Sequence, residues 1–269
     1  MELQTVRSRR QRLGQHFLRD HRVAVAIADA LAAEPPRVLE IGPGRGALTA
    51  PLLQRFPLVR AVELDGHLAE GLAARLGGPS GLEVWHADAL HDDLQELTRG
   101  GPWQVAGNLP YAVATPIIRR FLRCHFMISR LVVMVQREVA ERFLAPPGSP
   151  HRGLVSVEVE LFARAGRLFD VPPSAFLPPP KVVSTVLVID LQPPATSAEV
   201  MERALILAGA AFTQRRKKVA NALARIAPPA VVAEALASAG CEPGWRPQRV
   251  ETWQWLALAE SLPPLRQGG

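Results

Sequence analysis

Residues 38–48 read VLEIGPGRGAL, an apolar run that passes into a turn with three glycines and then into a helix-like segment. Glycines at such a place let the backbone approach a ligand closely, as at the first βα turn of nucleotide-binding α/β folds. The same kind of turn also occurs with no ligand. The stretch therefore predicts a strand, a tight turn and a helix, and leaves the ligand to be decided by its surroundings.

After this stretch, short β-rich runs alternate with segments of helical period as far as about residue 191. The further runs are residues 59–64, 82–86, 104–107, 131–135 and 183–191. Such alternation is typical of a mostly parallel sheet flanked by helices. We therefore predict a Rossmann-like α/β domain over residues 21–192, with a helix at residues 21–33 and a basic, irregular arm at residues 1–20.

Pro193 and Pro194, followed by Thr196 and Ser197, mark a boundary, because paired prolines break helices and Ser or Thr then caps a new one. The segments after the boundary have helical period and no strand-like runs; they are residues 198–212, 214–226, 230–239 and 249–262. We predict a small all-helical C-terminal domain over residues 196–269. Three tryptophans of this region have helical spacing and are expected in its core: Trp245, Trp253 and Trp255.

Composition limits the class of protein. Hydrophobic residues make up 48% of the 269-residue chain, which is enough for a sizeable core, and the net charge of +6 favours a polyanionic partner such as RNA, DNA or a membrane surface. Cys124 and Cys241 have neither disulfide-framework nor zinc-site spacing, so we expect both to be reduced and buried, with no metal. No signal peptide or membrane-spanning run is found, so the expected location is the cytoplasm.

Two acidic residues stand at the ends of the second and third predicted strands. Glu63 lies about 20 residues after the glycine turn, the spacing at which a carboxylate reaches ribose hydroxyls. Asp88 stands at the same edge of the sheet, where ligands of open α/β folds bind. A dinucleotide dehydrogenase would have the same beginning, although Pro43 within the turn favours S-adenosyl-L-methionine.

The fourth predicted strand ends in Asn108-Leu109-Pro110-Tyr111, which contains the only tyrosine of the chain. An exocyclic adenine amine is a poor nucleophile, so its two N–H groups need acceptors that realign the nitrogen lone pair toward the methyl donor. Asn108 Oδ1 and the backbone carbonyl of Leu109 or Pro110 can accept them, and Tyr111 offers a flat face on which a base can stack. The tetrapeptide predicts amine methylation that depends on positioning and electrostatics rather than on a strong base.

The chain resembles the ribosomal RNA adenine N6,N6-dimethyltransferase family, in the branch that modifies two adjacent adenosines near the 3′ end of small-subunit rRNA. The resemblance spans nearly the whole chain and rests on these segments: Leu13–Leu18, Glu40–Gly46, Glu63, Asp88, Asn108–Tyr111, Val135–Val139, Phe176–Val182 and Phe212–Lys218. It implies a class I methyltransferase fold, S-adenosyl-L-methionine as cofactor, and rRNA of an immature small subunit as substrate.

The resemblance also implies individual roles. The arm would close over the cofactor with His16 and Leu18, Glu63 would bind its ribose and Asp88 its adenine amine. Further cofactor contacts would come from Gly42, Gly44 and Asn108. Phe176 would close the other side of the target-base pocket. Two departures from the usual bacterial pattern stand out: His16 replaces an Asn, and Ala112-Val113-Ala114-Thr115 replaces a more polar run, with Thr115 expected to cap a helix that begins at Pro116.

Two basic clusters are candidates for phosphate contacts. Arg9, Arg10 and Arg12 belong to the arm, and Arg215, Arg216, Lys217 and Lys218 lie in the predicted helix at residues 214–226. A solvated helix face is the alternative for the second cluster.

Three rival functions remain. A large-subunit rRNA methyltransferase of the antibiotic-resistance type shares the fold and the tetrapeptide, a DNA adenine methyltransferase has similar chemistry, and a non-catalytic RNA-binding assembly factor would keep the fold alone. The segments at residues 176–182 and 214–218 favour the small-subunit enzyme. Nothing in the sequence demands more than a monomer.

Overall fold

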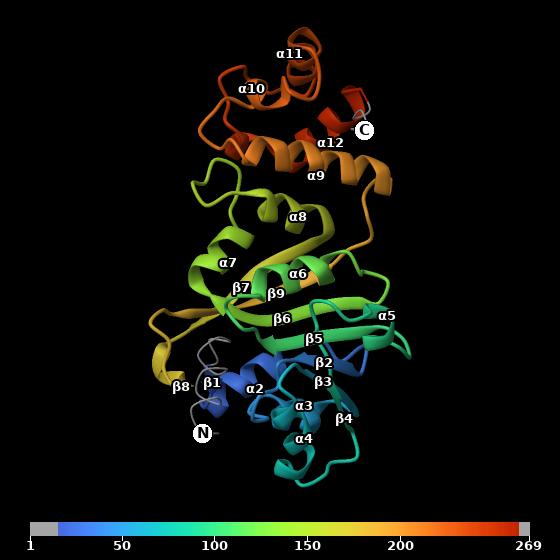
Figure 1. The fold of residues 1–269 in the computed structure, drawn as a ribbon, viewed down its shortest axis with the longest axis vertical. Coiled ribbons are helices and arrows are strands. Elements are labelled where there is room, and N and C mark those ends of the chain that lie inside the picture. The colour runs from blue at the N-terminus through green and yellow to red at the C-terminus, as the bar shows by residue number, and fades with distance from the viewer. Residues whose placement is uncertain (1–15, 264–269) are drawn as a thin grey trace, which may run out of the picture. The chain divides into compact units, whose positions relative to one another are not determined.

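The structure is a computed structural model that describes residues 16–263 of the chain (Figure 1). Seven strands form one sheet in the order β4-β3-β2-β5-β6-β9-β7, and two further strands, β1 and β8, pair separately. The strands are β1 (Phe17–Leu18), β2 (Arg37–Ile41), β3 (Leu58–Glu63), β4 (Leu82–His86), β5 (Trp103–Asn108), β6 (Ile128–Gln136), β7 (Ala163–Val171), β8 (Phe176–Leu177) and β9 (Ser184–Leu191).

The main sheet is mostly parallel, which confirms the predicted fold class. Strands β2 to β6 pair in parallel, and β9 runs antiparallel to β6. The six predicted runs are all strands. Strand β7, at the edge of the sheet, and the pair β1–β8 were not predicted, because short or edge strands need little of the apolar patterning that marks a buried strand.

The strand order places a topological switch point between β2 and β5. From β2 the chain builds outward through β3 to β4 and then returns to the other side of β2 to form β5. The connections after β2 and β5 therefore leave in opposite directions and open a crevice at the carboxyl ends of these two strands. Ligands of open α/β folds bind at such a crevice.

The helices and two 3₁₀ turns are α2 (His21–Asp29), α3 (Thr49–Arg55), α4 (Gly66–Arg75), α5 (Leu94–Leu97), α6 (Ala114–Leu122), α7 (Arg137–Phe143), α8 (Leu154–Phe162), η1 (Pro173–Ala175), α9 (Ala198–Phe212), α10 (Val219–Leu223), α11 (Pro229–Ser238), η2 (Pro247–Arg249) and α12 (Thr252–Ser261). The side chain of Ser197 accepts the Val200 N–H and so caps α9, as expected. Helix α6 begins at Ala114, so the expected cap at Thr115 is wrong. Pro116 sits in the first turn of α6, where its missing N–H has no partner to lose.

The described chain divides into two compact units, residues 16–140 with 164–192 and residues 141–163 with 193–263. The second unit is therefore not a single stretch of sequence: residues 141–163 join the segment that follows Pro193. The reason is packing, because Val157 and Leu161 of α8 share one buried cluster with Leu205 and Ala208 of α9. Hydrophobic periodicity predicts a helix but not which other helix it packs against, so the sequence did not reveal this contact.

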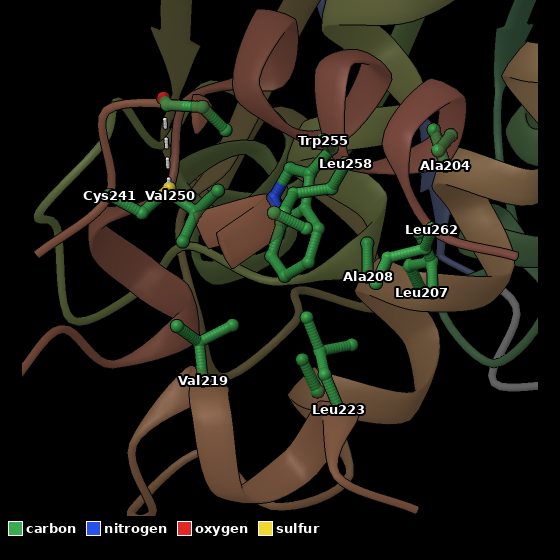
Figure 2. Close-up of a cluster of buried hydrophobic side chains, with 14 of the residues drawn as sticks. Ala204, Leu207, Ala208, Val219, Leu223, Cys241, Val250, Trp255, Leu258 and Leu262 are labelled. Carbon is green, nitrogen blue, oxygen red and sulfur yellow. Dashed lines mark hydrogen bonds between the residues drawn. The ribbon is translucent and has the colours of Figure 1, made fainter. Parts of the chain in front are cut away.

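The core of the second unit surrounds Trp255, which is fully buried and is drawn with Val219 and Leu223 of α10 in Figure 2. Cys241 lies in the same cluster, and Cys124 is buried in the first unit; both are free thiols. The core assignment of the tryptophans holds for Trp255 but is wrong for Trp253, which is 56% exposed. The buried face of α12 consists of residues 254, 255, 258 and 259, so residue 253 points away from it.

The described residues contain neither a candidate membrane-spanning helix nor a candidate metal-ligand cluster. None of the helices they form has both the length and the apolar character needed to cross a bilayer. Within residues 16–263, no three His, Cys, Asp or Glu side chains gather as ligands for a metal ion.

Candidate functional site

One cavity lies at the switch point and collects most of the predicted site residues of the first unit. Its walls come from the start of the described chain, the turn after β2, the end of β3 and the tetrapeptide after β5. The lining residues are His16, Phe17, Leu18, Glu40, Gly42, Pro43, Gly44, Arg45, Ala47, Leu48, Glu63, Asn108, Leu109, Pro110 and Tyr111. Four segments that lie up to 95 positions apart in the sequence thus meet at the carboxyl edge of the sheet.

The glycine turn needs its glycines for two different reasons. Gly42 and Gly44 have φ values of +68° and +58°, a region that other residues rarely adopt. A Cβ at Gly44 would also lie 3.1 Å from the Phe17 ring, so a side chain there would push the arm away from the turn. The turn therefore offers bare backbone to a ligand and allows residue 17 to approach it.

Glu63 ends β3 at the cavity and is held by the backbone. Its Oε2 accepts the Gly44 N–H at 3.0 Å, and its Oε1 accepts the Asp65 N–H at 3.0 Å. Burial raises the pKa of this carboxyl above its usual value, and the hydrogen bonds from Asp65 and Gly44 oppose that rise. Each oxygen keeps a second lone pair, so Glu63 can accept two hydroxyl groups of a ligand.

Asn108 ends β5, and a hydrogen bond defines the orientation of its amide. Its Nδ2 donates to the backbone carbonyl of His16 at 2.9 Å. A carbonyl oxygen accepts and never donates, so the atom that faces it must be the amide nitrogen rather than the amide oxygen. The Oδ1 atom is thereby the acceptor that Asn108 can present to a ligand.

Tyr111 is half-buried at the cavity wall. Its hydroxyl shares a hydrogen bond of 2.9 Å with Ser184 Oγ, and its ring lies 5.5 Å from the His16 ring, centre to centre. Burial raises the pKa of the phenol, with the Ser184 bond opposing, so the side chain is neutral near pH 7. Of the two candidate carbonyls, that of Pro110 accepts the Val113 N–H at 3.0 Å, which favours Leu109 as the second acceptor for an amine.

The start of the described chain is joined to a segment near residue 177. Phe17 pairs with Leu177, and Leu18 pairs with Phe176, in an antiparallel register. His16 adds a side-chain bond, with Nδ1 2.8 Å from the Pro178 carbonyl oxygen. Phe176 itself is 1% exposed, belongs to a core cluster of the first unit and is not among the residues that line the cavity with Tyr111.

Asp88 follows β4 and is not among the residues that line the cavity. Its Oδ1 accepts the Leu90 N–H at 2.8 Å, and its Oδ2 lies 2.8 Å from His91 Nδ1. Burial opposes ionisation of Asp88, but the hydrogen bonds from His91 and Leu90 outweigh it and lower the pKa of the carboxyl. Asp88 is therefore an ionised acceptor whose oxygens already have one partner each.

The predicted basic cluster of the second unit is not helical. Helix α9 ends at Phe212 and α10 begins at Val219, so Arg215 to Lys218 lie in the turn between them. Arg215 Nη2 donates to the carbonyls of Pro150 and Arg152, at 2.7 and 2.8 Å, and thus ties a loop of its own unit. Arg216, Lys217 and Lys218 are exposed. The other predicted cluster, Arg9, Arg10 and Arg12, lies outside the described residues.

The sequence reasoning assigned no site role to several residues that line the cavity, among them Phe17, Glu40 and Arg45. The Arg45 guanidinium lies 4.8 Å from the centre of the Phe17 ring and holds the ring against the turn. Glu40 is 1% exposed, and its Oε2 has no hydrogen-bond partner among the described residues. An acid inside an otherwise apolar strand, directly before the glycine turn, was the signal available for Glu40.

A family model and several curated proteins that resemble this chain all carry the names of rRNA methyltransferases. A family model described as ribosomal RNA adenine dimethylase matches residues 6–262. Ribosomal RNA small subunit methyltransferase A of Acinetobacter baylyi is 38% identical over 95% of this chain and 93% of its own length. The protein of that name from a Synechococcus species is 40% identical over 95% of this chain and 96% of its own length.

Two solved structures share the fold over nearly the whole chain. The 23S rRNA methyltransferase ErmE has a TM-score of 0.72 and 29% identity, over 91% of this chain and 99% of its own. A dimethyladenosine transferase from Plasmodium falciparum has a TM-score of 0.74 and 24% identity, over 90% and 96% of the two chains. The second likeness is evidence for the fold alone.

Proposed function

The chain belongs to the ribosomal RNA adenine dimethylase family, and on that premise we propose that it transfers methyl groups from S-adenosyl-L-methionine to N6 of two adjacent adenosines near the 3′ end of small-subunit rRNA. The observation that carries this proposal is the amide of Asn108. Its nitrogen is held by the His16 carbonyl, so its oxygen is available to accept an amine N–H at the switch-point cavity.

The residues of the cavity fit the proposed cofactor. The turn at Gly42 and Gly44 has no Cβ, and the Glu63 oxygens keep lone pairs for two ribose hydroxyls. We assign the methionine end to the side of the cavity formed by Leu18 and the backbone of His16, and the adenine amine to Asp88 through a remaining lone pair. When bound, S-adenosyl-L-methionine supplies an electrophilic methyl group and leaves as a neutral thioether.

The protein's part in the reaction is to prepare the adenine nitrogen. Asn108 Oδ1 and the Leu109 carbonyl accept the two amine N–H groups, which turns the nitrogen lone pair toward the methyl group. Tyr111 stacks against the base, because its ring is neutral and its hydroxyl is held by Ser184. The N–C bond forms as the C–S bond breaks, and the methylated nitrogen then loses a proton to water, so no buried general base is required.

Finer parts of the proposal concern the partner. We propose that the second unit and the arm with Arg9, Arg10 and Arg12 contact rRNA phosphates in an immature small subunit, in the cytoplasm, with the protein acting as a monomer. Because Arg215 is engaged by two backbone carbonyls, the phosphate contacts of its cluster fall to Arg216, Lys217 and Lys218. Since Phe176 is buried, its role is to hold Leu18 through the β1–β8 pair, and stacking of the target base falls to Tyr111.

A second candidate is methylation of large-subunit rRNA. It is favoured by the 29% identity with ErmE, a 23S rRNA methyltransferase, across 91% of this chain. The relatives named for the small subunit are more similar, at 38% and 40% identity, and they favour the first candidate.

The proposal is tested by methyl transfer from labelled S-adenosyl-L-methionine to unmethylated small subunits, large subunits and duplex DNA, with the modified nucleoside identified by mass spectrometry. Dimethyladenosine should form on small subunits alone. Asn108→Ala should lower the rate by about 100-fold or more, because it removes a preorganised acceptor. Asn221→Ala, which changes the only other asparagine of the chain at an exposed position, should match the wild type.

Each other result has a definite meaning. Label on large subunits would establish the second candidate, and label on DNA would move the protein to the DNA methyltransferases. No label at all, together with no binding of S-adenosylhomocysteine by calorimetry, would leave a non-catalytic RNA-binding protein.

A further inference from the structure

Two hydrogen bonds in series connect the catalytic amide with the segment after β8. Asn108 Nδ2 donates to the His16 carbonyl at 2.9 Å, and His16 Nδ1 lies 2.8 Å from the Pro178 carbonyl. Both bonds involve a single residue of the arm. His16 therefore holds Asn108 with its backbone and is itself held by its side chain.

The chemistry of both bonds allows one direction only. The Pro178 oxygen can accept but not donate, so the His16 Nδ1 atom carries the proton. The His16 oxygen likewise accepts, so it selects the amide rotamer in which Asn108 Nδ2 faces the arm. The opposite rotamer would place two oxygen atoms at hydrogen-bond distance and would aim N–H groups at the substrate amine.

The position of the His16 carbonyl depends on a short anchor. Strand β1 has two residues, Phe17 and Leu18, and is preceded directly by His16. The pairs Phe17–Leu177 and Leu18–Phe176 hold the residues that follow, whereas the bond to Pro178 holds residue 16 itself. A two-residue strand restrains its neighbour weakly, so the side-chain bond matters for the position of the carbonyl.

We propose that His16 is a positioning residue, whose Nδ1–H bond to the Pro178 carbonyl holds its own carbonyl in the place that turns Asn108 Oδ1 toward the substrate amine. This inference rests on the proposed function, because it assigns the acceptor role to Oδ1. On this inference, position 16 needs a hydrogen-bonding side chain for the bond to Pro178 and not for a contact with the cofactor.

A matched pair of variants separates the donor from the ring. His16→Leu keeps apolar bulk beside Tyr111 and loses the donor, whereas His16→Asn loses the ring contact and keeps a donor. His16→Leu should lower kcat about tenfold, which is the effect of one lost hydrogen bond on the population of the correct rotamer. His16→Asn should stay within about twofold of the wild type. Both variants should bind S-adenosylhomocysteine as the wild type does. The control is His67→Leu, which changes an exposed histidine of α4.

A second readout does not depend on activity. In a nitrogen–proton NMR spectrum, the Asn108 side-chain amide is identified as the signal missing from Asn108→Ala. Its exchange with solvent should be slow in the wild type and in His16→Asn, and about tenfold faster in His16→Leu.

The inference is overturned by any of three results. They are an unchanged kcat and amide exchange in His16→Leu, an equal defect in His16→Asn, and a loss of S-adenosylhomocysteine affinity that accounts for the whole loss of activity. If the wild type transfers no methyl group, the proposed function fails, while the amide exchange still decides whether His16 orients Asn108.

Discussion

Glu40 is a buried acid at the cavity wall, and its charge state depends on burial more than on any partner. Burial raises its pKa from 4.5 to about 8, the nearby charge of Glu63 raises it further, and the Thr49 hydroxyl opposes the rise. At pH 7 the carboxyl is therefore mostly protonated in the folded protein and ionised in the unfolded chain. An acid with a raised pKa in the folded state contributes stability below pH 4.5 that is lost as the pH rises through about 8.

Glu40→Gln should remove this part of the pH dependence, because an amide resembles a protonated carboxyl in shape and has no charge to bury. We expect the variant and the wild type to have similar Tm values at pH 5. At pH 9 the variant should be more stable, with a Tm higher by roughly 5 °C. Scanning calorimetry from pH 5 to 9 measures the difference, with Glu70→Gln on the exposed face of α4 as control. A constant difference in Tm across this range would contradict the raised pKa.

The turn between α9 and α10 divides four neighbouring basic residues between two tasks. All four residues are exposed, but Arg215 also donates to the carbonyls of Pro150 and Arg152 and so holds a loop of its own unit. The residue after the cluster also has a structural role, because the Val219 N–H donates to the Trp245 carbonyl at 2.8 Å and orients α10. Arg215 would have to give up these two hydrogen bonds to bind phosphate, so we expect the phosphate contacts from Arg216, Lys217 and Lys218.

Changing Arg216, Lys217 and Lys218 together to Gln should therefore weaken RNA binding without unfolding the unit. We expect the slope of log K against log salt to fall by about 2 in magnitude, since each lost phosphate contact contributes roughly 0.7–0.9. Arg215→Gln is the matched control and should lower thermal stability while leaving the slope within about 0.5 of the wild type. Filter binding to small-subunit rRNA at several salt concentrations measures the slope, and equal slopes for wild type and triple variant would exclude this turn as a phosphate site.

At the scale of the whole molecule, every residue assigned to the reaction belongs to the first unit, and the second unit has a separate core around Trp255. An ion pair between a buried arginine and an exposed glutamate reinforces the second unit. Arg152 is fully buried and binds Glu160 through two hydrogen bonds of 2.6 and 2.7 Å, and Thr252 at the start of α12 donates to Glu160 as well. Cofactor binding should therefore not require the second unit to be intact.

Trp255→Ala should destabilise the second unit by about 3–5 kcal/mol, because it leaves a large cavity in the smaller core. Affinity for S-adenosylhomocysteine should remain within about twofold of the wild type, as it depends on the first unit. Methylation of small subunits should fall, since the proposed phosphate contacts lie in the unfolded part. Calorimetry for binding and limited proteolysis for the second unit test this, and a parallel loss of cofactor affinity would mean that the units fold as one.

Features with a local physical cause could be predicted from the order of the residues alone. The glycine turn, Glu63 about 20 residues later and Asn108-Leu109-Pro110-Tyr111 each follow a strand with a strong apolar pattern, so the fold class and the carboxyl-edge site could be predicted. Ser197 after two prolines likewise predicted the start of α9, because capping depends on neighbours only a few residues away.

Features that depend on contacts between distant segments became visible only in the folded chain. The pair β1–β8 joins residues about 160 positions apart, buries Phe176 and brings the His16 carbonyl to Asn108. Packing of α8 against α9 placed residues 141–163 in the second unit, and the bonds to Pro150 and Arg152 gave Arg215 a structural role within that unit. The physical reason is that residue type and spacing indicate what a side chain is able to bind. Its actual partner depends on which distant segments the fold brings next to it.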